Sequence, residues 1–182
     1  NQQIGAPNLT DDIWLHGGTE AAITETIVKG RINQMPAHKD FLDEGKIRMA
    51  GVSNANPERI RLANDILGGR VVSVRNQFSP AFLSSRPELE LCDEMGIAFL
   101  PWSPLGGISN AGELASLHAA FKEVAQAHGV SAQQVTLAWQ LSLSPRVIPI
   151  PGSSRPETIQ DSVRAVDLEL SPDELALLDA SL

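Results

Sequence analysis

Polar and glycine-rich stretches follow the short apolar runs of this sequence, and they carry groups that could hold a ligand. The four stretches are Ser53-Asn54, Asn76-Gln77, residues 102–107 (Trp-Ser-Pro-Leu-Gly-Gly) and residues 151–155 (Pro-Gly-Ser-Ser-Arg). Serine, asparagine and glutamine offer neutral donors and acceptors that suit a carboxamide. Backbone N–H groups of glycine-rich loops and helix N-termini suit phosphates, and an arginine adds charge there.

Each stretch also has an ordinary structural explanation. A Ser-Asn pair at a strand end is more often a turn or a helix cap than a ligand contact, and Asn76-Gln77 can satisfy buried backbone. A Gly-Gly pair is commonly a loop device, and a lone Arg155 is commonly solvated. What favours a ligand site is that all four stretches fall at one edge of the predicted sheet, where Trp102 adds an aromatic face.

The elements that would position these groups alternate between short apolar runs and amphipathic ones. Buried strands are predicted at residues 47–52, 71–74, 97–100 and 147–150. Helices are predicted at residues 56–67, 85–96, 114–128, 131–141, 156–166 and from 171 onward. This alternation is typical of βα units and a parallel sheet, in which ligands bind beyond the carboxyl ends of the strands.

The first 45 residues give a weaker pattern. Residues 12–16 are compatible with a strand, residues 21–32 with a helix, and residues 41–45 with the end of a helix. The chain starts Asn1-Gln2-Gln3, with neither an initiator methionine nor a signal-peptide pattern.

Composition excludes several classes of function. The chain has 182 residues and a formal net charge of −8, with scattered basic residues, so we expect no nucleic-acid partner and no anionic-membrane partner. No apolar run approaches the ~20 residues of a membrane span. Cys92 is the only cysteine, so we expect no intrachain disulfide, no thiolate metal site and a reducing, cytoplasmic location.

Several motifs together resemble one protein family. They are Gly45-Lys46-Ile47-Arg48, Gly51-Val52-Ser53-Asn54, Asn76-Gln77-Phe78-Ser79-Pro80, the run from Gly96 to Gly107, Ala138-Trp139, and Ile150-Pro151-Gly152-Ser153-Ser154. In order and spacing, residues 41–182 resemble the C-terminal half of the aldo-keto reductases. The resemblance implies an α/β fold derived from the (β/α)8 TIM barrel, incomplete here, with four to five βα units matching strands five to eight. We expect one domain over residues 1–182, with residues 1–40 poorly matched.

The resemblance further implies a nicotinamide cofactor, NADP(H). Ser53, Asn54 and Gln77 would hold the nicotinamide carboxamide, and Trp102 would stack on the ring. The loop from Trp102 would line the pyrophosphate, and the fourth stretch would meet the adenosine 2′-phosphate end. The remaining candidate cofactor-binding residues are Ser103, Pro104, Leu105, Gly107, Gly152, Ser153, Ser154 and Arg155. NAD(H) stays open as the cofactor, because Gly152, Thr158 and Ser162 stand where many members carry Lys, Arg and Asn.

Catalysis departs from the family pattern. The family's tetrad is Asp, Tyr, Lys and His, with tyrosine as the proton donor, and this sequence contains no tyrosine. His16 follows Leu15 as in the family's histidine motif, and it is the candidate catalytic residue. The alternative is an ordinary histidine at a strand end or on the surface.

Two functions therefore stay open. The first is a shortened NAD(P)(H)-dependent reductase of small aldehydes or ketones, weak or inactive without the tyrosine. The second is a non-catalytic half-barrel that binds nucleotide or forms a homodimer through open sheet edges. Residues 1–40 are either a diverged N-terminus or the product of an altered reading frame.

Overall fold

The computed structural model describes residues 48–107 and 118–182, which all belong to one compact unit, His38–Leu182. The elements expected within residues 1–45 lie outside the described residues, as do His16 and the first part of the helix expected at 114–128. None of the helices in the described ranges is long and apolar enough to cross a membrane.

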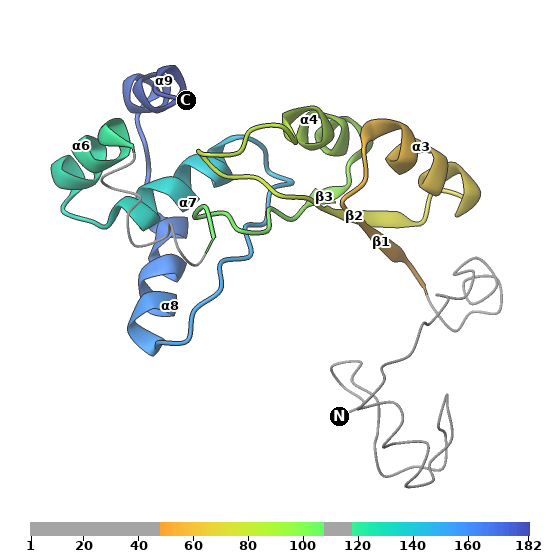
Figure 1. Ribbon diagram of the computed structural model, residues 1–182, viewed down its shortest axis with the longest axis horizontal. Helices are drawn as coiled ribbons and strands as arrows, with labels where there is room; N and C mark the ends of the chain where they lie inside the picture. The colour runs from red at the N-terminus through yellow and green to blue at the C-terminus, as the bar shows by residue number, and fades with distance from the viewer. Residues whose placement is uncertain (1–47, 108–117) are drawn as a thin grey trace, which may run out of the picture. The chain divides into compact units, whose positions relative to one another are not determined.

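Three strands form a parallel sheet whose order follows the sequence (Figure 1). They are β1 (Ala50–Ser53), β2 (Val71–Arg75) and β3 (Ala98–Phe99). In the middle strand, Val74 pairs with Val52 on one side and Phe99 on the other. The helices α3 (Pro57–Ile66) and α4 (Arg86–Met95) make the two crossovers that parallel neighbours require. The predicted alternation of strands and helices is confirmed for this part of the chain.

The fourth predicted strand, residues 147–150, does not form a regular strand, so that expectation is wrong. A single parallel bridge joins Val147 to Phe99, whose N–H and C=O bond to the backbone on either side of Val147 over 2.8 Å each. Pro149 and Pro151 have no N–H to donate to a ladder, and β3 is only two residues long. Residues 147–150 therefore run alongside β3, but too few of their backbone groups are hydrogen-bonded to it for them to form a strand.

The second half of the described chain is helical. It contains α6 (Ala119–His128), α7 (Ala132–Ser142), α8 (Pro156–Val163), the 3-10 helix η2 (Arg164–Asp167) and α9 (Pro172–Ala180). The helix expected at 156–166 thus ends early, at Val163, and a tighter turn follows. That turn buries Ala165 in the core and leaves Val163 and Val166 exposed.

Local chemistry explains where the helices begin and end. The side chains of Asn56 and Ser131 accept hydrogen bonds from the third residue of α3 and α7 over 3.1 and 3.0 Å. Ser171 and Glu174 form a reciprocal capping box at the start of α9. Gly96 ends α4 in the left-handed conformation, with a φ of 69°. These caps confirm the helix boundaries that the sequence predicts at these residues.

A chain of aromatic contacts joins the sheet to the helices. Phe78 packs edge-on against Phe99 of β3 at 6.0 Å and stacks on Trp139 of α7 at 5.9 Å. Trp139 also meets Phe121 of α6 at 5.8 Å, and its indole N–H donates to Asp179 of α9 over 2.8 Å. All four rings are fully buried, so one continuous core carries both the sheet and the helices that surround the site.

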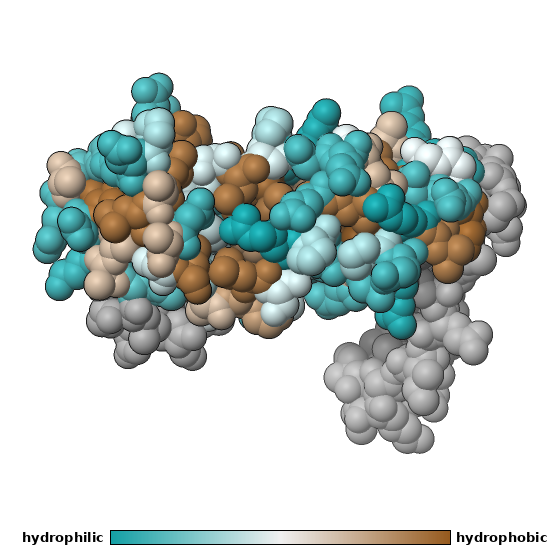
Figure 2. All heavy atoms as spheres, turned by 90° about the horizontal axis from the view of Figure 1, so that it is seen from above, coloured by the Kyte–Doolittle hydropathy of each residue, from teal (hydrophilic) through white to brown (hydrophobic). Residues whose placement is uncertain are grey.

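Hydrophobic side chains also reach the surface. On the face seen in Figure 2 they gather in several separate patches among hydrophilic ones. Met49, Leu62 and Ile66 are exposed beside β1 and on α3, and Val163 and Val166 are exposed around η2. Within the described residues, β1 pairs with β2 alone, so Met49, which directly precedes β1, lies at a sheet edge with one described neighbour.

Candidate functional site

A small pocket of about 270 Å³ lies where β1 and β2 end and where α3 and α4 begin. It is lined by Asn54, Ala55, Asn56, Asn76, Gln77, Phe82, Ser85, Glu88 and Trp102. Three residues predicted to hold the nicotinamide, Asn54, Gln77 and Trp102, are therefore brought together here. A parallel bridge between Gln77 and Trp102 fixes their separation through the backbone.

Hydrogen bonds hold the predicted nicotinamide residues against each other. Asn54 has a φ of 51°, a left-handed conformation that asparagine tolerates better than most residues. Its N–H donates to the Arg75 carbonyl over 3.0 Å, and the Trp102 indole N–H donates to its Oδ1 over 3.0 Å. The Asn54 side-chain oxygen thus accepts from Trp102, and its amide nitrogen is a further donor of this pocket-lining residue.

Two other polar residues serve the backbone. Asn76 is buried and exchanges two hydrogen bonds with Ala55, which donates to Oδ1 over 3.2 Å and accepts from Nδ2 over 2.9 Å. The Ser53 hydroxyl donates to the Arg75 carbonyl over 3.0 Å, and Ser53 does not line either pocket described here. Asn76 therefore satisfies buried backbone groups, which is the structural role that the sequence analysis allows for it.

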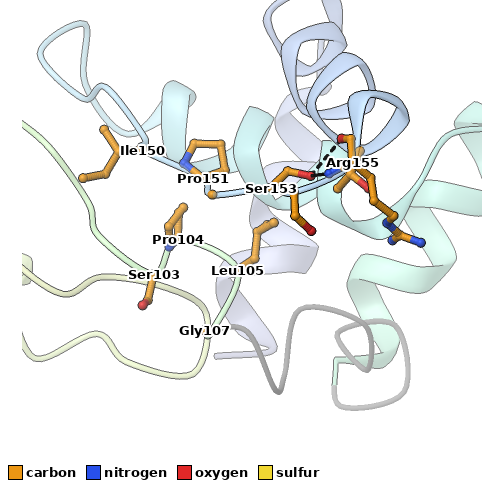
Figure 3. Close-up of a pocket in the computed structure, with 11 residues that line it drawn as sticks. Ser103, Pro104, Leu105, Gly107, Ile150, Pro151, Ser153 and Arg155 are labelled. Carbon is orange, nitrogen blue, oxygen red and sulfur yellow. Dashed lines mark hydrogen bonds between the residues drawn. The ribbon is translucent and has the colours of Figure 1, made fainter.

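A larger pocket of about 540 Å³ is lined by residues that come later in the chain. It lies between the loop at 103–107 and the start of α8 (Figure 3). Eight of the predicted cofactor-binding residues line it, namely Ser103, Pro104, Leu105, Gly107, Gly152, Ser153, Ser154 and Arg155. Ile150, Pro151 and Thr158 complete the lining. Trp102 lines the small pocket, and the next residue along the chain, Ser103, lines the large one.

Positive φ angles recur in the loop at 103–107. Ser103, Gly106 and Gly107 have φ values of 50°, 83° and 92°. Such left-handed positions let a short loop turn tightly, and the Gly106 N–H closes this turn on the Ser103 carbonyl over 2.9 Å. The loop is held from behind by Gln140 of α7, which is fully buried and donates from Nε2 to the Pro104 carbonyl over 2.7 Å.

The opposite wall, residues 152–155, is exposed and is held by a local turn. The Ser153 hydroxyl accepts from the Arg155 N–H over 3.1 Å and donates to the Arg155 carbonyl over 3.0 Å. Arg155 precedes α8 without a side-chain cap, so N–H groups of the first turn lack a capping partner from that residue. In Figure 3 the Arg155 guanidinium extends away from Ser103 and Pro104.

Sequence reasoning missed two residues of this region. The sequence pattern places Glu88 at the start of a helix and Gln140 within a helix. The structure buries both residues beside the predicted loops. Only the three-dimensional packing reveals this, because neither residue departs from an ordinary helical pattern.

The lone cysteine is not a reactive group. Cys92 lies buried on α4, and burial together with the nearby negative charge of Glu88 raises the pKa of its thiol to about 12. Within the described ranges, no three His, Cys, Asp or Glu side chains gather into a metal-ligand cluster.

Comparison with known proteins identifies the family. The model of the Aldo/keto reductase family matches residues 12–182, a range that includes His16 and both pockets. A pyridoxine 4-dehydrogenase from Escherichia coli (strain K12) is 32% identical over 140 residues, which cover 77% of this chain and 46% of that protein. An aldo-keto reductase from Mycobacterium sp. (strain KMS) is 36% identical over 150 residues, covering 82% and 51%.

Solved structures agree. The crystal structure of an aldo/keto reductase from Klebsiella pneumoniae in complex with NADP and acetate matches with a TM-score of 0.68 and 26% identity, covering 78% of this chain and 50% of that one. This chain spans about half the length of the curated relatives it matches. With the family model matching most of its residues, the chain belongs to the aldo/keto reductase family.

Proposed function

We propose that this chain binds a nicotinamide dinucleotide, NADP(H), along its two pockets, as the cofactor-binding part of an oxidoreductase that acts on small aldehydes or ketones. The observation that carries the proposal is that the predicted loops line two pockets of different chemistry, which are linked through the consecutive residues Trp102 and Ser103. Neutral amides and an indole line the small one, and left-handed loop backbone lines the large one. A dinucleotide has a carboxamide at one end and phosphates further along, in the same order.

The fit of the cofactor rests on this donor set. Asn54, Gln77 and Trp102 would face the nicotinamide, the loop at 103–107 would receive the pyrophosphate, and Arg155 with Ser154 would meet the 2′-phosphate. When bound, the cofactor supplies a hydride to a carbonyl carbon. We further infer that β1, β2, β3 and residues 147–150 correspond to strands five to eight of the family barrel.

The proton that reduction also requires has no tyrosine donor among these 182 residues. A positioned general acid contributes about 10²–10⁴-fold in rate. We therefore propose that this chain binds the cofactor but reduces carbonyls slowly or not at all. His16 remains the candidate for the family's histidine, and NAD(H) the alternative cofactor.

The test is a binding titration of the full 182-residue chain with NADPH, followed by the fluorescence of the reduced nicotinamide. We expect a dissociation constant in the micromolar range, equivalent to about −8 kcal/mol. The matched variant is Arg155→Ala, which should weaken NADPH about two- to fivefold and leave NADH unchanged, because only NADPH carries the 2′-phosphate. Absence of NADPH and NADH binding up to millimolar concentration would overturn the proposal.

The second candidate is self-association through the β1 edge, favoured by the exposed Met49, which directly precedes β1, a strand with one described neighbour. Sedimentation of the chain over a range of concentrations tests it. We expect a monomer if cofactor binding is the main function, and a homodimer that Met49→Lys disrupts if the edge is an interface.

A further inference from the structure

The small pocket contains a carboxylate, Glu88, which the sequence analysis does not predict to be there. Glu88, in the first turn of α4, lines this pocket and has only 9% of its surface exposed. No group among the described residues donates a hydrogen bond to its Oε2. Of the described residues that line the pocket, Glu88 is also the only one with a charged side chain. The pocket therefore combines neutral amides with one negative charge that has no cation in its lining.

The position of Glu88 in the fold stabilises its negative charge and also strengthens the effect of that charge on neighbouring groups. The first turn of a helix favours a carboxylate, because its free N–H groups carry partial positive charge. At the same time, a charge away from water acts on its neighbours more strongly than a surface charge does. The pKa of Cys92, raised to about 12 by burial first and by Glu88 second, reports such an effect on the inner side of α4.

The ligand proposed for this pocket changes its charge during the reaction. The reduced nicotinamide ring is neutral, whereas the oxidised ring carries one positive charge, and the rest of the dinucleotide is the same in both forms. A fixed negative charge beside the ring therefore stabilises the oxidised form selectively. Asn54, Gln77 and Trp102, which line the same pocket as Glu88, are the residues proposed to hold the ring.

We propose that Glu88 sets the balance between the two redox forms of the bound cofactor by favouring the positively charged, oxidised nicotinamide. This inference rests on the proposed function of the pocket. Glu88 acts through its charge and not by contact with the transferred hydride. Its role is to raise the affinity for NADP⁺ relative to that for NADPH.

The experiment measures the dissociation constants of NADP⁺ and NADPH separately, by calorimetry, for the 182-residue chain and for Glu88→Gln. The amide has nearly the size of the carboxylate and removes the charge. We expect the substitution to weaken NADP⁺ about three- to tenfold, as one unit charge in a partly hydrated interior would, while NADPH changes less than twofold. Glu88→Met, a second neutral variant, should give the same change in the ratio, because charge and not hydrogen bonding causes it.

The control is Glu90→Gln on the same helix. Glu90 is exposed, so its charge is screened by water and salt, and the ratio of the two constants should stay unchanged. Urea unfolding of each variant verifies that it is folded.

The outcomes distinguish failure of the role of Glu88 from failure of the proposed cofactor binding. If both redox forms bind and Glu88→Gln shifts them equally or not at all, Glu88 does not sense the ring charge and the inference is overturned, while the proposed function stands. A ratio that changes in Glu88→Met but not in Glu88→Gln would overturn the inference too, since it would point to a hydrogen bond that the amide retains and not to the charge. If neither form binds to the unmodified chain, the proposed function itself fails, and the inference fails with it.

Discussion

The two pockets of this molecule are built in opposite ways. In the small pocket, polar side chains are fastened by bonds between residues far apart in sequence, such as Trp102 to Asn54 and Asn76 to Ala55. In the large pocket, the wall at 152–155 is exposed, and two hydrogen bonds between Ser153 and Arg155 hold its turn. More distant anchors occur at the loop at 103–107, where Gln140 donates to the Pro104 carbonyl, and at Ile150, whose N–H donates to the Pro101 carbonyl over 3.2 Å.

The difference matches the chemistry proposed for each pocket. An uncharged ring and its carboxamide must be oriented by neutral donors and acceptors, which are effective only when they are fixed in advance. Phosphates are attracted by charge and by backbone N–H groups, and they can order an exposed segment when they bind. Substitutions in the two pockets should therefore differ, with those in the small pocket costing mainly stability and those in the large pocket costing mainly affinity.

Asn76→Ala should break the small pocket and have the largest effect. The substitution leaves the Ala55 N–H and C=O without partners in a buried place, which should cost about 2–4 kcal/mol in the free energy of unfolding. Urea unfolding followed by circular dichroism measures it. Gln160→Ala, at an exposed amide on α8, is the control and should cost under about 0.5 kcal/mol. Similar losses in the two variants would contradict the stabilising role of the buried bonds between Asn76 and Ala55.

Gln140→Met tests the side-chain anchor of the loop at 103–107. It removes the bond to the Pro104 carbonyl, but it also removes a buried Oε1 that accepts no bond from the described residues. These effects partly offset, so we expect a loss of about 1–2 kcal/mol in stability together with a roughly fivefold weaker NADPH binding. The exposed Gln126→Met should change neither quantity. Weaker stability with unaltered affinity would mean that the loop does not need its anchor.

Gly107→Ala tests the loop backbone alone. At a φ of 92°, a side chain is strained, and the nearest atom to an added Cβ is the Ser103 hydroxyl at 4.0 Å, so crowding plays no part. We expect a cost of about 1 kcal/mol and weaker cofactor binding. Gly152→Ala is the matched control for the stability change, because Gly152 has an ordinary φ and open space around it. An equal loss of stability at both glycines would show that the left-handed turn is not the cause.

The smallest effect is a pH dependence remote from both pockets. Hydrogen bonds from the backbone and hydroxyl of Ser171, followed by the bond to His128, lower the pKa of Glu174 below its usual value. A lowered pKa in the folded state stabilises the fold above the unfolded pKa of about 4.3, and this stabilisation is lost as the pH falls through the folded value.

The measurement compares unfolding midpoints of the unmodified chain and Glu174→Gln at pH 7, 5 and 3. We expect the advantage of the unmodified chain to be present at pH 7 and 5 and to shrink by pH 3. An advantage that is the same at all three pH values would be incompatible with titration of Glu174.

Much of the fold could be predicted because its signals are local. The caps at Asn56, Ser131 and Ser171 use side chains within three residues of the N–H groups they bind, so the sequence alone places the helix starts. The failure at 147–150 has a different origin. Its apolar pattern predicts a strand, but whether it forms a ladder depends on the length of β3 and on where Pro149 and Pro151 lie against it.

The candidate site, like the fold, could be predicted from the sequence only in part. The sequence by itself determined which loops carry amides, glycines and an arginine, and a parallel sheet then requires these loops to share an edge. Only the tertiary structure decided how the residues divide between two pockets, that Ser53 and Asn76 are bonded to backbone, and that Gln140 and Glu88 are buried beside the loops. The physical reason is that burial and hydrogen-bond partners depend on residues 20 to 50 positions away, and a side chain's type does not record which distant groups the fold brings to it.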